Sequence, residues 1–322
     1  MAKIELPDQT LSDMNDELEK RFDNSRRPHM GASMIGGPCE RQIWNQFHFL
    51  TENTIGAPGV KAIADGHHSE AVMVERLQQT PGVTLRVEQG HKRKQFSFKD
   101  GHLGGSLDGL ISGISHLPEV EHVWEHKCVN EKKFSILVRL ALLEESSALY
   151  NWDQIYFGQA QTYMHYFKKD WHYLTVCTPG SRGETSCVTP YNKDAAQHYI
   201  DKAKRIIASH RPPPKISETA AWFQCKFCPF TDNCHGQKLP DVNCRTCAHS
   251  TAKDDGSWEC ELHEDVLSFK DQLMGCGDHL FNPGTVPGNQ TDAGEGWIEY
   301  EMPDGNTIRN QAATVSTTAT AE

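Results

Sequence analysis

The chain has 322 residues, which is enough to bury one large hydrophobic core and to carry a smaller appendage. Its 43 aspartates and glutamates outnumber 32 lysines and arginines. The formal net charge of −11 argues against general adhesion to nucleic acid but leaves room for one local basic groove. No apolar run approaches the roughly 18 residues of a membrane span, and residues 1–4 lead into charged sequence without a signal-peptide pattern. We therefore expect a cytoplasmic protein with no membrane partner.

The cysteine content points to metal ligation. Eleven cysteines in a chain expected in the cytosol are more typical of metal sites than of disulfides. Seven of them fall between Cys225 and Cys276, so the metal sites are expected mainly toward the C-terminal end.

The first elements are expected to be helical. Residues 1–30 form a polar segment with a weak helical pattern over residues 11–22, and Cys39 opens a further helix. A longer helix is expected over residues 58–80, where apolar residues form a broad stripe that Pro81-Gly82 ends. Glu70 lies on this helix, either as a metal-binding carboxylate or as a surface glutamate.

Residues 83–98 predict a pair of strands around Gln89-Gly90. Basic side chains in this region would form either a local patch for nucleic acid or the solvated face of a hairpin: Arg86, Lys92, Arg93, Lys94 and Lys99.

Two further strands, over residues 105–111 and 123–127, are expected to form a hairpin with chemistry on it. Glu125 and Lys127 are two residues apart and therefore share one face of the strand, where Asp108 can meet them from its neighbour. Two carboxylates beside a lysine suit Mg²⁺ or Mn²⁺ with an activated water. The alternative is a solvated strand face with an incidental ion pair.

The remaining elements alternate between helix and strand. Gln159 and Tyr163 lie four residues apart on one helix face, either as packing groups or as an amide and a phenol directed at a substrate backbone. This alternation predicts an α/β fold with a central mixed sheet flanked by helices. The expected helices are residues 132–145, 153–167 and 195–210, and the expected strands are residues 171–178 and 184–188.

The cysteine-rich region contains two motifs. Cys225, Cys228 and Cys234 form C-x2-C-x5-C, whereas C-x2-C-x12-C and one further cysteine follow at Cys244, Cys247, Cys260 and Cys276. Beyond residue 283, we expect a small hairpin from residues 297–302 and 306–310, and disorder over residues 311–322.

In their order, these motifs resemble the PD-(D/E)XK nuclease superfamily, and most closely its RecB-like iron–sulfur exonuclease branch, which includes CRISPR-associated, AddB-type and phage-encoded exonucleases. The resemblance covers roughly residues 31–236. Leu107 stands where the family name has a proline, and His67 is the alternative to Glu70 as the first metal ligand, because some RecB-like members place a histidine there. The residues that carry the resemblance are Glu70, Asp108, Glu125, Lys127, Gln159 and Tyr163.

The resemblance implies a restriction-endonuclease-like core over residues 31–238 and a Mg²⁺- or Mn²⁺-dependent deoxyribonuclease. Such an exonuclease would act on DNA in recombination, replication or repair, together with a possible partner protein of these pathways, and in the host cytoplasm if it is phage-encoded. Glu70, Asp108 and Glu125 would hold the ion, Lys127 would orient the water, and Gln159 and Tyr163 would position the strand. The resemblance also implies a [4Fe–4S] cluster on Cys39, Cys225, Cys228 and Cys234.

The cysteines allow two partitions. The cluster leaves Cys244, Cys247, Cys260 and Cys276 as a second set for Zn²⁺, in which His263 or His279 can replace one cysteine. The rival is a zinc ribbon on Cys225, Cys228, Cys244 and Cys247. In the first partition, residues 239–283 form a zinc-knuckle-like segment, residues 284–322 form a tail, and Cys128, Cys177 and Cys187 are core thiols.

Two other classes of function stay open at this point. One is a noncatalytic nucleic-acid or partner-binding module that two metal sites stabilise. The other is an iron–sulfur redox enzyme, although the chain has no G-x-G-x-x-G fingerprint after a strand.

Overall fold

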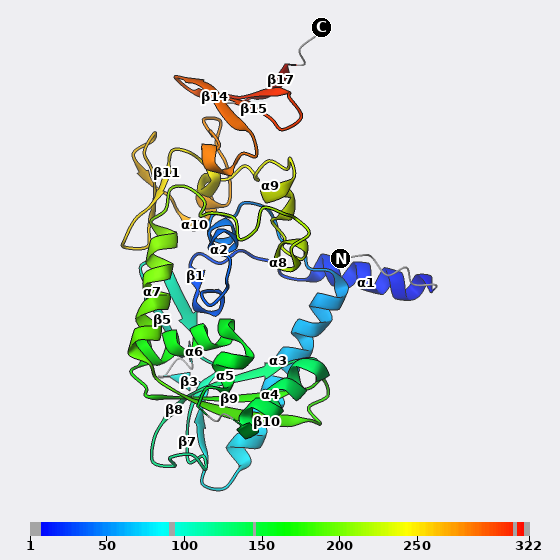
Figure 1. Cartoon of the computed structure of the whole chain (residues 1–322), viewed down its shortest axis with the longest axis vertical. Coiled ribbons are helices and arrows are strands. Elements are labelled where there is room, and N and C mark those ends of the chain that lie inside the picture. The colour runs from blue at the N-terminus through cyan, green and yellow to red at the C-terminus, as the bar shows by residue number, and fades with distance from the viewer. Residues whose placement is uncertain (1–7, 90–93, 144–145, 312–313, 319–322) are drawn as a thin grey trace.

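The computed structural model describes residues 8–89, 94–143, 146–311 and 314–318 (Figure 1). Its centre is a five-stranded sheet in the order β10-β9-β8-β7-β2. Strands β8 and β9 run parallel, and the other neighbours run antiparallel. The expected mixed sheet is therefore confirmed. Its strands are β2 (Thr84–Arg86), β7 (Gly109–Ser112), β8 (His122–Cys128), β9 (Trp171–Cys177) and β10 (Glu184–Pro190).

Helices cover both faces of this sheet. Trp124 of β8 packs with Met73 of α3, whereas the adjacent Val123 packs with Met164 of α6. Neighbouring strand residues point to opposite faces, so α3 and α6 lie on opposite sides of the sheet. Helices α4 and α5 pack on β10, and α7 packs on α6. The bounds are α3 (Ala57–Gln79), α4 (Glu131–Leu143), α5 (Ala148–Trp152), α6 (Gln154–Phe167) and α7 (Lys193–Ile207).

The four helices expected in the core are confirmed, and their ends have local causes. Pro58 lies in the first turn of α3, and the chain turns at Gly82, whose φ of +83° is a conformation that glycine adopts without strain. Asp153 caps α6 by accepting hydrogen bonds from the backbone N–H groups of Ile155 and Tyr156.

The prediction of one strand over residues 105–111 is wrong, because this segment contains parts of two strands that belong to different sheets. Strand β6 (Leu103–Ser106) pairs with β1 (Met30–Gly31) and β5 (Ser97–Asp100), whereas β7 pairs with β8 and β2. The break falls at Leu107 and Asp108. The Leu107 N–H donates to Phe96 O at 2.9 Å, and Asp108 Oδ2 accepts the His126 N–H at 2.9 Å. The Asp108 side chain thus takes a backbone donor of β8, which ends the ladder at this point.

The strands expected over residues 83–98 are shorter than predicted. The chain forms β2, a small pair of β3 (Glu88–Gln89) and β4 (Lys94–Gln95), and then β5. Gly90, Lys92 and Arg93 lie outside the described residues.

The cysteine-rich region packs on α2 (Glu40–Phe47), which Cys39 caps. Trp44 and Phe47 of this helix share a core with Phe230 and Trp258. The short elements of the region are α8 (Phe223–Lys226), α9 (Thr231–His235), η2 (Cys244–Thr246), β11 (Ser250–Ala252), β12 (Trp258–Cys260), β13 (Asp265–Val266) and α10 (Phe269–Gln272).

The C-terminal hairpin is confirmed as β15 (Trp297–Glu301) and β16 (Thr307–Gln311), which belong to a four-stranded antiparallel sheet with β14 (Asn289–Gly294) and β17 (Thr314–Thr318). Disorder over residues 311–322 is wrong for β17, which pairs with β16. Threonine favours strands, and a neighbouring strand supplies its backbone partners. Residues 312–313 and 319–322 lie outside the described part.

At the other end of the chain, the expected N-terminal helix is α1 (Gln9–Arg21). None of the helices in the described part of the chain has the length and apolar character that crossing a membrane requires.

Candidate active site

Asp108, Glu125 and Lys127 meet at the junction of β7 and β8. Lys127 Nζ lies 2.8 Å from Glu125 Oε2 and 3.7 Å from Asp108 Oδ2. Glu125 and Lys127 share one face of β8, as their spacing predicts, and Asp108 reaches them from the break that precedes β7. One ammonium is therefore shared by two carboxylates.

Glu125 is the most buried member of the group. Its side chain is 3% exposed, compared with 16% for Asp108 and 20% for Lys127. Burial raises the pKa of Glu125 to about 8, the Asp108 carboxylate adds to the rise, and the Lys127 ammonium opposes it. Glu125 Oε1 is buried and has no hydrogen-bond partner. A buried carboxylate oxygen without a partner is costly unless a cation binds it, so the residues present fit a divalent ion.

Lys127 is held as a cation. Burial alone would lower its pKa, but the adjacent Glu125 and Asp108 carboxylates outweigh that effect and raise the pKa above its ordinary value.

Gln159 and Tyr163 of α6 extend the group by hydrogen bonds. Gln159 Nε2 donates to Glu125 Oε2 at 3.1 Å and to the Tyr163 hydroxyl oxygen at 3.3 Å. The close approach of Tyr163 requires Gly105 on β6, because a Cβ at that position would lie 2.6 Å from the phenol ring. The structure thus brings together five of the six predicted catalytic residues through direct contacts.

Glu70 is near enough to Asp108 and Lys127 for their charges to affect its pKa. It is half-buried on α3. Burial raises the pKa of Glu70 and the Asp108 carboxylate raises it further, while Lys127 and His67 oppose the rise. Glu70 and His67 are three residues apart and share one helix face. The choice between them as first ligand therefore stays a prediction.

A cavity of about 990 Å³ lies beside this helix face. His67 and Ile63 of α3 line it, together with residues of β1 and α2. Its polar and basic lining residues include Asn24, Arg26, Arg27, His29 and Ser33.

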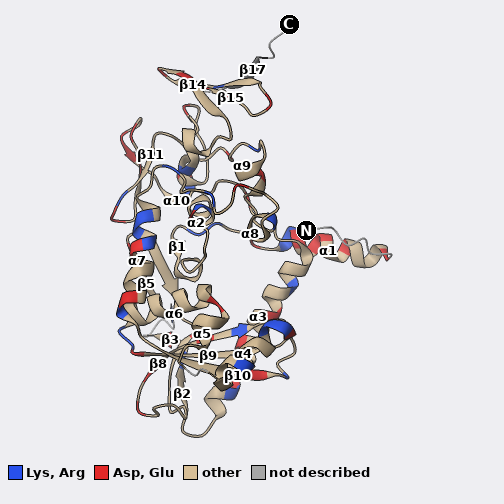
Figure 2. Cartoon of the chain, viewed as in Figure 1, with Lys and Arg blue, Asp and Glu red and all other residues tan. Residues whose placement is uncertain are grey.

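The expected basic patch has less unpaired positive charge than its sequence indicates. Arg86 pairs with Glu121, which neutralises its charge. Lys94 and Lys99 lie on β4 and β5. Figure 2 shows Lys and Arg distributed over several helices rather than gathered on one element.

The cysteines fall into two groups in space. One pocket is lined by Cys39, Cys225, Cys228 and Cys234. Another is lined by Cys244, Cys247, Cys260 and Cys276, with His263 and His279. Cys225 and Cys228 thus lie apart from Cys244 and Cys247, which disfavours the zinc-ribbon partition. Cys177 and Cys187 are buried, and Cys128 is half-buried.

The pocket around Cys39 fits a thiolate-bound cluster. The N–H of Gln42 lies 3.4 Å from Cys39 Sγ, and Asn45 Nδ2 lies 3.7 Å from Cys234 Sγ. Burial raises the pKa of the Cys228 thiol to about 11, with smaller increases from the charges of the other three cysteines. Bound iron reverses this effect, because it stabilises thiolates, and N–H donors to sulfur assist.

Sequence reasoning missed two contributors to the site. The backbone N–H of His126 fixes Asp108, and Gly105 admits Tyr163. The glycine at position 105 is the signal in the sequence for the close approach of Tyr163. It can be interpreted only once β6 is placed against α6, the helix that carries Q-x3-Y.

No protein-family model matches the chain, and no curated protein matches it. Among solved structures, the chain is similar to an alkaline exonuclease from Laribacter hongkongensis, at 15% identity and a TM-score of 0.40, over 60% of this chain and 91% of that one. It is also similar to a phage-related exonuclease from Haemophilus somnus, at 12% identity and a TM-score of 0.38, over 55% of this chain and 92% of that one. These similarities are too low to assign an activity to the chain. Its chemistry is therefore inferred from its own side chains.

Proposed function

We propose that the chain is a Mg²⁺- or Mn²⁺-dependent deoxyribonuclease that hydrolyses phosphodiester bonds as an exonuclease. The observation that carries the proposal is the buried Glu125 Oε1, which has no hydrogen-bond partner, while the other oxygen of this carboxylate, Oε2, lies 2.8 Å from the ammonium that Lys127 shares with Asp108. A structural ion pair has no need of a free carboxylate oxygen, whereas a site for a hard cation does.

Glu70, Asp108 and Glu125 would hold the ion. When bound, the ion supplies positive charge that neutralises the scissile phosphate and lowers the pKa of a nearby water. Asp108 is ready for this role, because its Oδ2 is already fixed by the His126 N–H.

The other polar groups have roles that follow from their contacts. Lys127 would orient the attacking water and stabilise charge that develops on the phosphate. Gln159 would hold Glu125 in place, and Tyr163 would help to position the strand. Attack by water forms a new O–P bond and breaks the P–O3′ bond, and the departing 3′-oxygen takes a proton. The products carry a 5′-phosphate and a 3′-hydroxyl.

The DNA would approach through the cavity beside α3. His67 lies on its wall one helical turn from Glu70, and Arg26 and Arg27 line it elsewhere. The same cavity is lined by Asp23 and Glu52, and Arg26 pairs with Asp241 at 2.8 Å, so the contact with phosphate is assigned to Arg27.

Cys39, Cys225, Cys228 and Cys234 would hold the [4Fe–4S] cluster. Bound there, the cluster would tie the start of α2 to the segment that follows the catalytic sheet. We propose a structural clamp for this group and no part in hydrolysis.

The test is degradation of end-labelled DNA by the anaerobically purified protein, first with EDTA and then with Mn²⁺. We expect no degradation with EDTA, recovery with Mn²⁺, and a loss of about 100-fold or more in Asp108→Asn and Lys127→Ala, since each removes one preorganised charge. Glu119→Gln is the matched control, because this exposed acid lies in the loop that joins the same two strands.

Folded Asp108→Asn protein that degrades DNA at the parent rate would contradict the proposal. Tight DNA binding without any hydrolysis in Mn²⁺ would indicate the noncatalytic binding module instead.

A further inference from the structure

Four thiols of the segment 244–276 line one cavity outside the catalytic site. The cavity measures about 190 Å³ and is lined by Cys244, Cys247, Cys260 and Cys276. Cys247 and Cys260 are buried, Cys244 is half-buried and Cys276 is exposed. Neither the proposed hydrolysis nor the cluster on Cys39 uses these four side chains.

Two short elements place three of these thiols close together. Cys244 and Cys247 flank a single turn, η2, in which the Cys247 N–H donates to Cys244 O at 3.2 Å. The hairpin of β11 and β12 then places Cys260 opposite Ser250, beside this turn.

From this arrangement, we propose that Cys244, Cys247, Cys260 and Cys276 form a Zn²⁺ site. Four cysteine thiolates are the donor set of a closed structural zinc site. The inference goes beyond the proposed nuclease activity and does not depend on it.

The two histidines near the cavity have different roles. His279 is buried, and its Nε2 lies 3.3 Å from Thr246 Oγ1, so it serves the packing of the turn. His263 Nε2 lies 3.9 Å from Cys276 Sγ and 3.3 Å from Asp278 Oδ2. Both contacts are made by the same ring nitrogen, so its single N–H can be donated either to the Asp278 carboxylate or to the Cys276 thiolate.

Zinc binding would close the cavity. Among the described residues, only the ligand atoms of His263, Cys276 and Asp278 form a group in which all lie within 4.8 Å of one another. The sulfur atoms of the four cysteines are therefore farther apart than 4.8 Å in at least some pairs. Zn–S bonds of about 2.3 Å require sulfurs roughly 3.8 Å apart, so the ion would draw the four segments together.

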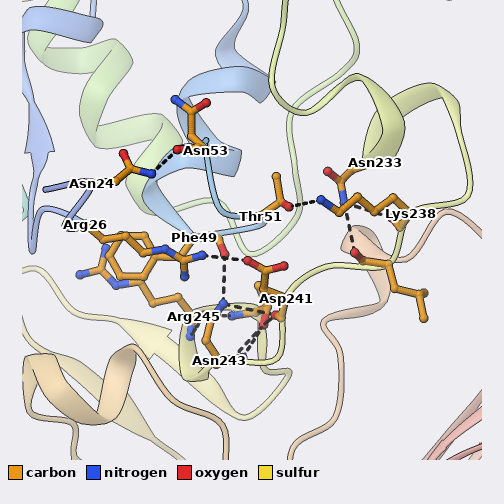
Figure 3. Close-up of polar contacts among 12 residues, drawn as sticks. Asn24, Arg26, Phe49, Thr51, Asn53, Asn233, Lys238, Asp241, Asn243 and Arg245 are labelled. Carbon is orange, nitrogen blue, oxygen red and sulfur yellow. Dashed lines mark hydrogen bonds and ion pairs between the residues drawn. The ribbon is translucent and has the colours of Figure 1, made fainter. Parts of the chain in front are cut away.

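The ion would also fix the contact between η2 and the end of α2. Arg245, between the first two cysteines, is 1% exposed and donates to Phe47 O and Pro28 O, each at 2.7 Å. Asn243 Nδ2 donates to Phe49 O at 3.0 Å. Figure 3 shows Arg245 and Asn243 converging on the chain at Phe49, just beyond the end of α2. Holding η2 rigid would therefore hold this end of α2.

The test is the zinc and iron content of the purified chain and of four variants, measured by mass spectrometry. We expect about one zinc per chain in the parent and in Cys187→Ser, a control that alters a buried thiol of the sheet. Cys247→Ser and Cys276→Ser should lose the zinc and keep the parent iron content. His263→Ala should keep the zinc but lose it to a chelator at roughly 10- to 100-fold lower chelator concentration.

Cys276 is exposed, so Cys276→Ser tests the site even if Cys247→Ser does not fold. Reconstitution with Co²⁺ adds a second measurement, because a tetrahedral cobalt thiolate absorbs strongly in the visible range. A parent chain without zinc, zinc retained in folded Cys276→Ser, or iron lost in place of zinc would overturn the assignment. Because none of these measurements uses DNA, their failure is distinct from a failure of the nuclease proposal.

Discussion

At the scale of single residues, the charges of the site suit a divalent cation. The two carboxylates of Asp108 and Glu125 and the ammonium of Lys127 sum to −1 when all are ionised. Including Glu70 brings the sum to −2, which one divalent cation balances. Burial and the charge of Asp108 raise the pKa of both Glu70 and Glu125, and a bound cation would oppose this rise.

Gln159 is expected to act on metal binding through Glu125. The variant Gln159→Leu removes the hydrogen bond to Glu125 Oε2 and should raise the Mn²⁺ concentration that gives half-maximal activity by about 10- to 100-fold. Gln161→Leu is the matched control on the same helix, because its amide donates to Pro190 O away from the carboxylates. It should lower stability without changing the Mn²⁺ requirement. Equal Mn²⁺ requirements in the two variants would refute a positioning role for Gln159.

At the scale of elements, α2 connects the two cysteine groups. Cys39 caps its start, and Arg245 and Asn243 bind carbonyl oxygens at its end and just beyond. His48, the C-cap residue, stacks on Trp44 with ring centroids 3.6 Å apart and contacts Trp258 edge-on. The helix is therefore held mainly by groups outside itself, as is usual for an eight-residue helix.

The buried ring of His48 should make this region sensitive to acid. Burial lowers the pKa of His48 to about 3, whereas in the unfolded chain it stands near 6.5. The unfolded state binds the extra proton between these two values, so the free energy of unfolding falls as the pH drops below 6.5. At pH 5.5 the loss relative to pH 7.5 should be about 1.4 kcal/mol from this ring.

Urea unfolding at the two pH values measures this loss. His48→Phe keeps the stacking and should reduce the difference between the two pH values by about 1.4 kcal/mol. His198→Phe, at an exposed position of α7, should leave the difference unchanged. An unchanged difference in His48→Phe would show that His48 does not titrate on unfolding.

The elements differed in how well the sequence predicts them. Apolar periodicity and end signals predict α3 and α6, because these are local causes. The break at Asp108 was not predictable from alternation, which continues through residues 105–111. Its cause is a hydrogen bond to His126, 18 residues away. Strand β17 was missed because Thr-rich sequence also fits a disordered tail, and pairing with β16 decides between the two.

At the scale of the whole molecule, the site was more predictable than its surroundings. The order of the acidic, lysine and Q-x3-Y motifs along the sequence predicts that Asp108, Glu125, Lys127, Gln159 and Tyr163 form one site. The structure brings these five residues into contact. The partition of the cysteines was open in sequence, because spacing alone allows a zinc ribbon. The packing of α2 against the later segments separates the two groups, and such long-range packing depends on buried polar groups such as Arg245 that carry no motif.

The most direct test of the central claim is equilibrium binding of Mn²⁺ to the DNA-free protein, measured by the paramagnetic resonance of the free ion. We expect a Mn²⁺ site in the parent and in Glu119→Gln that is lost in Asp108→Asn and in Glu125→Gln, both checked for parent-like folding by circular dichroism. Unchanged Mn²⁺ binding in these two variants would contradict the central claim, because the ion would then lie away from the junction of β7 and β8.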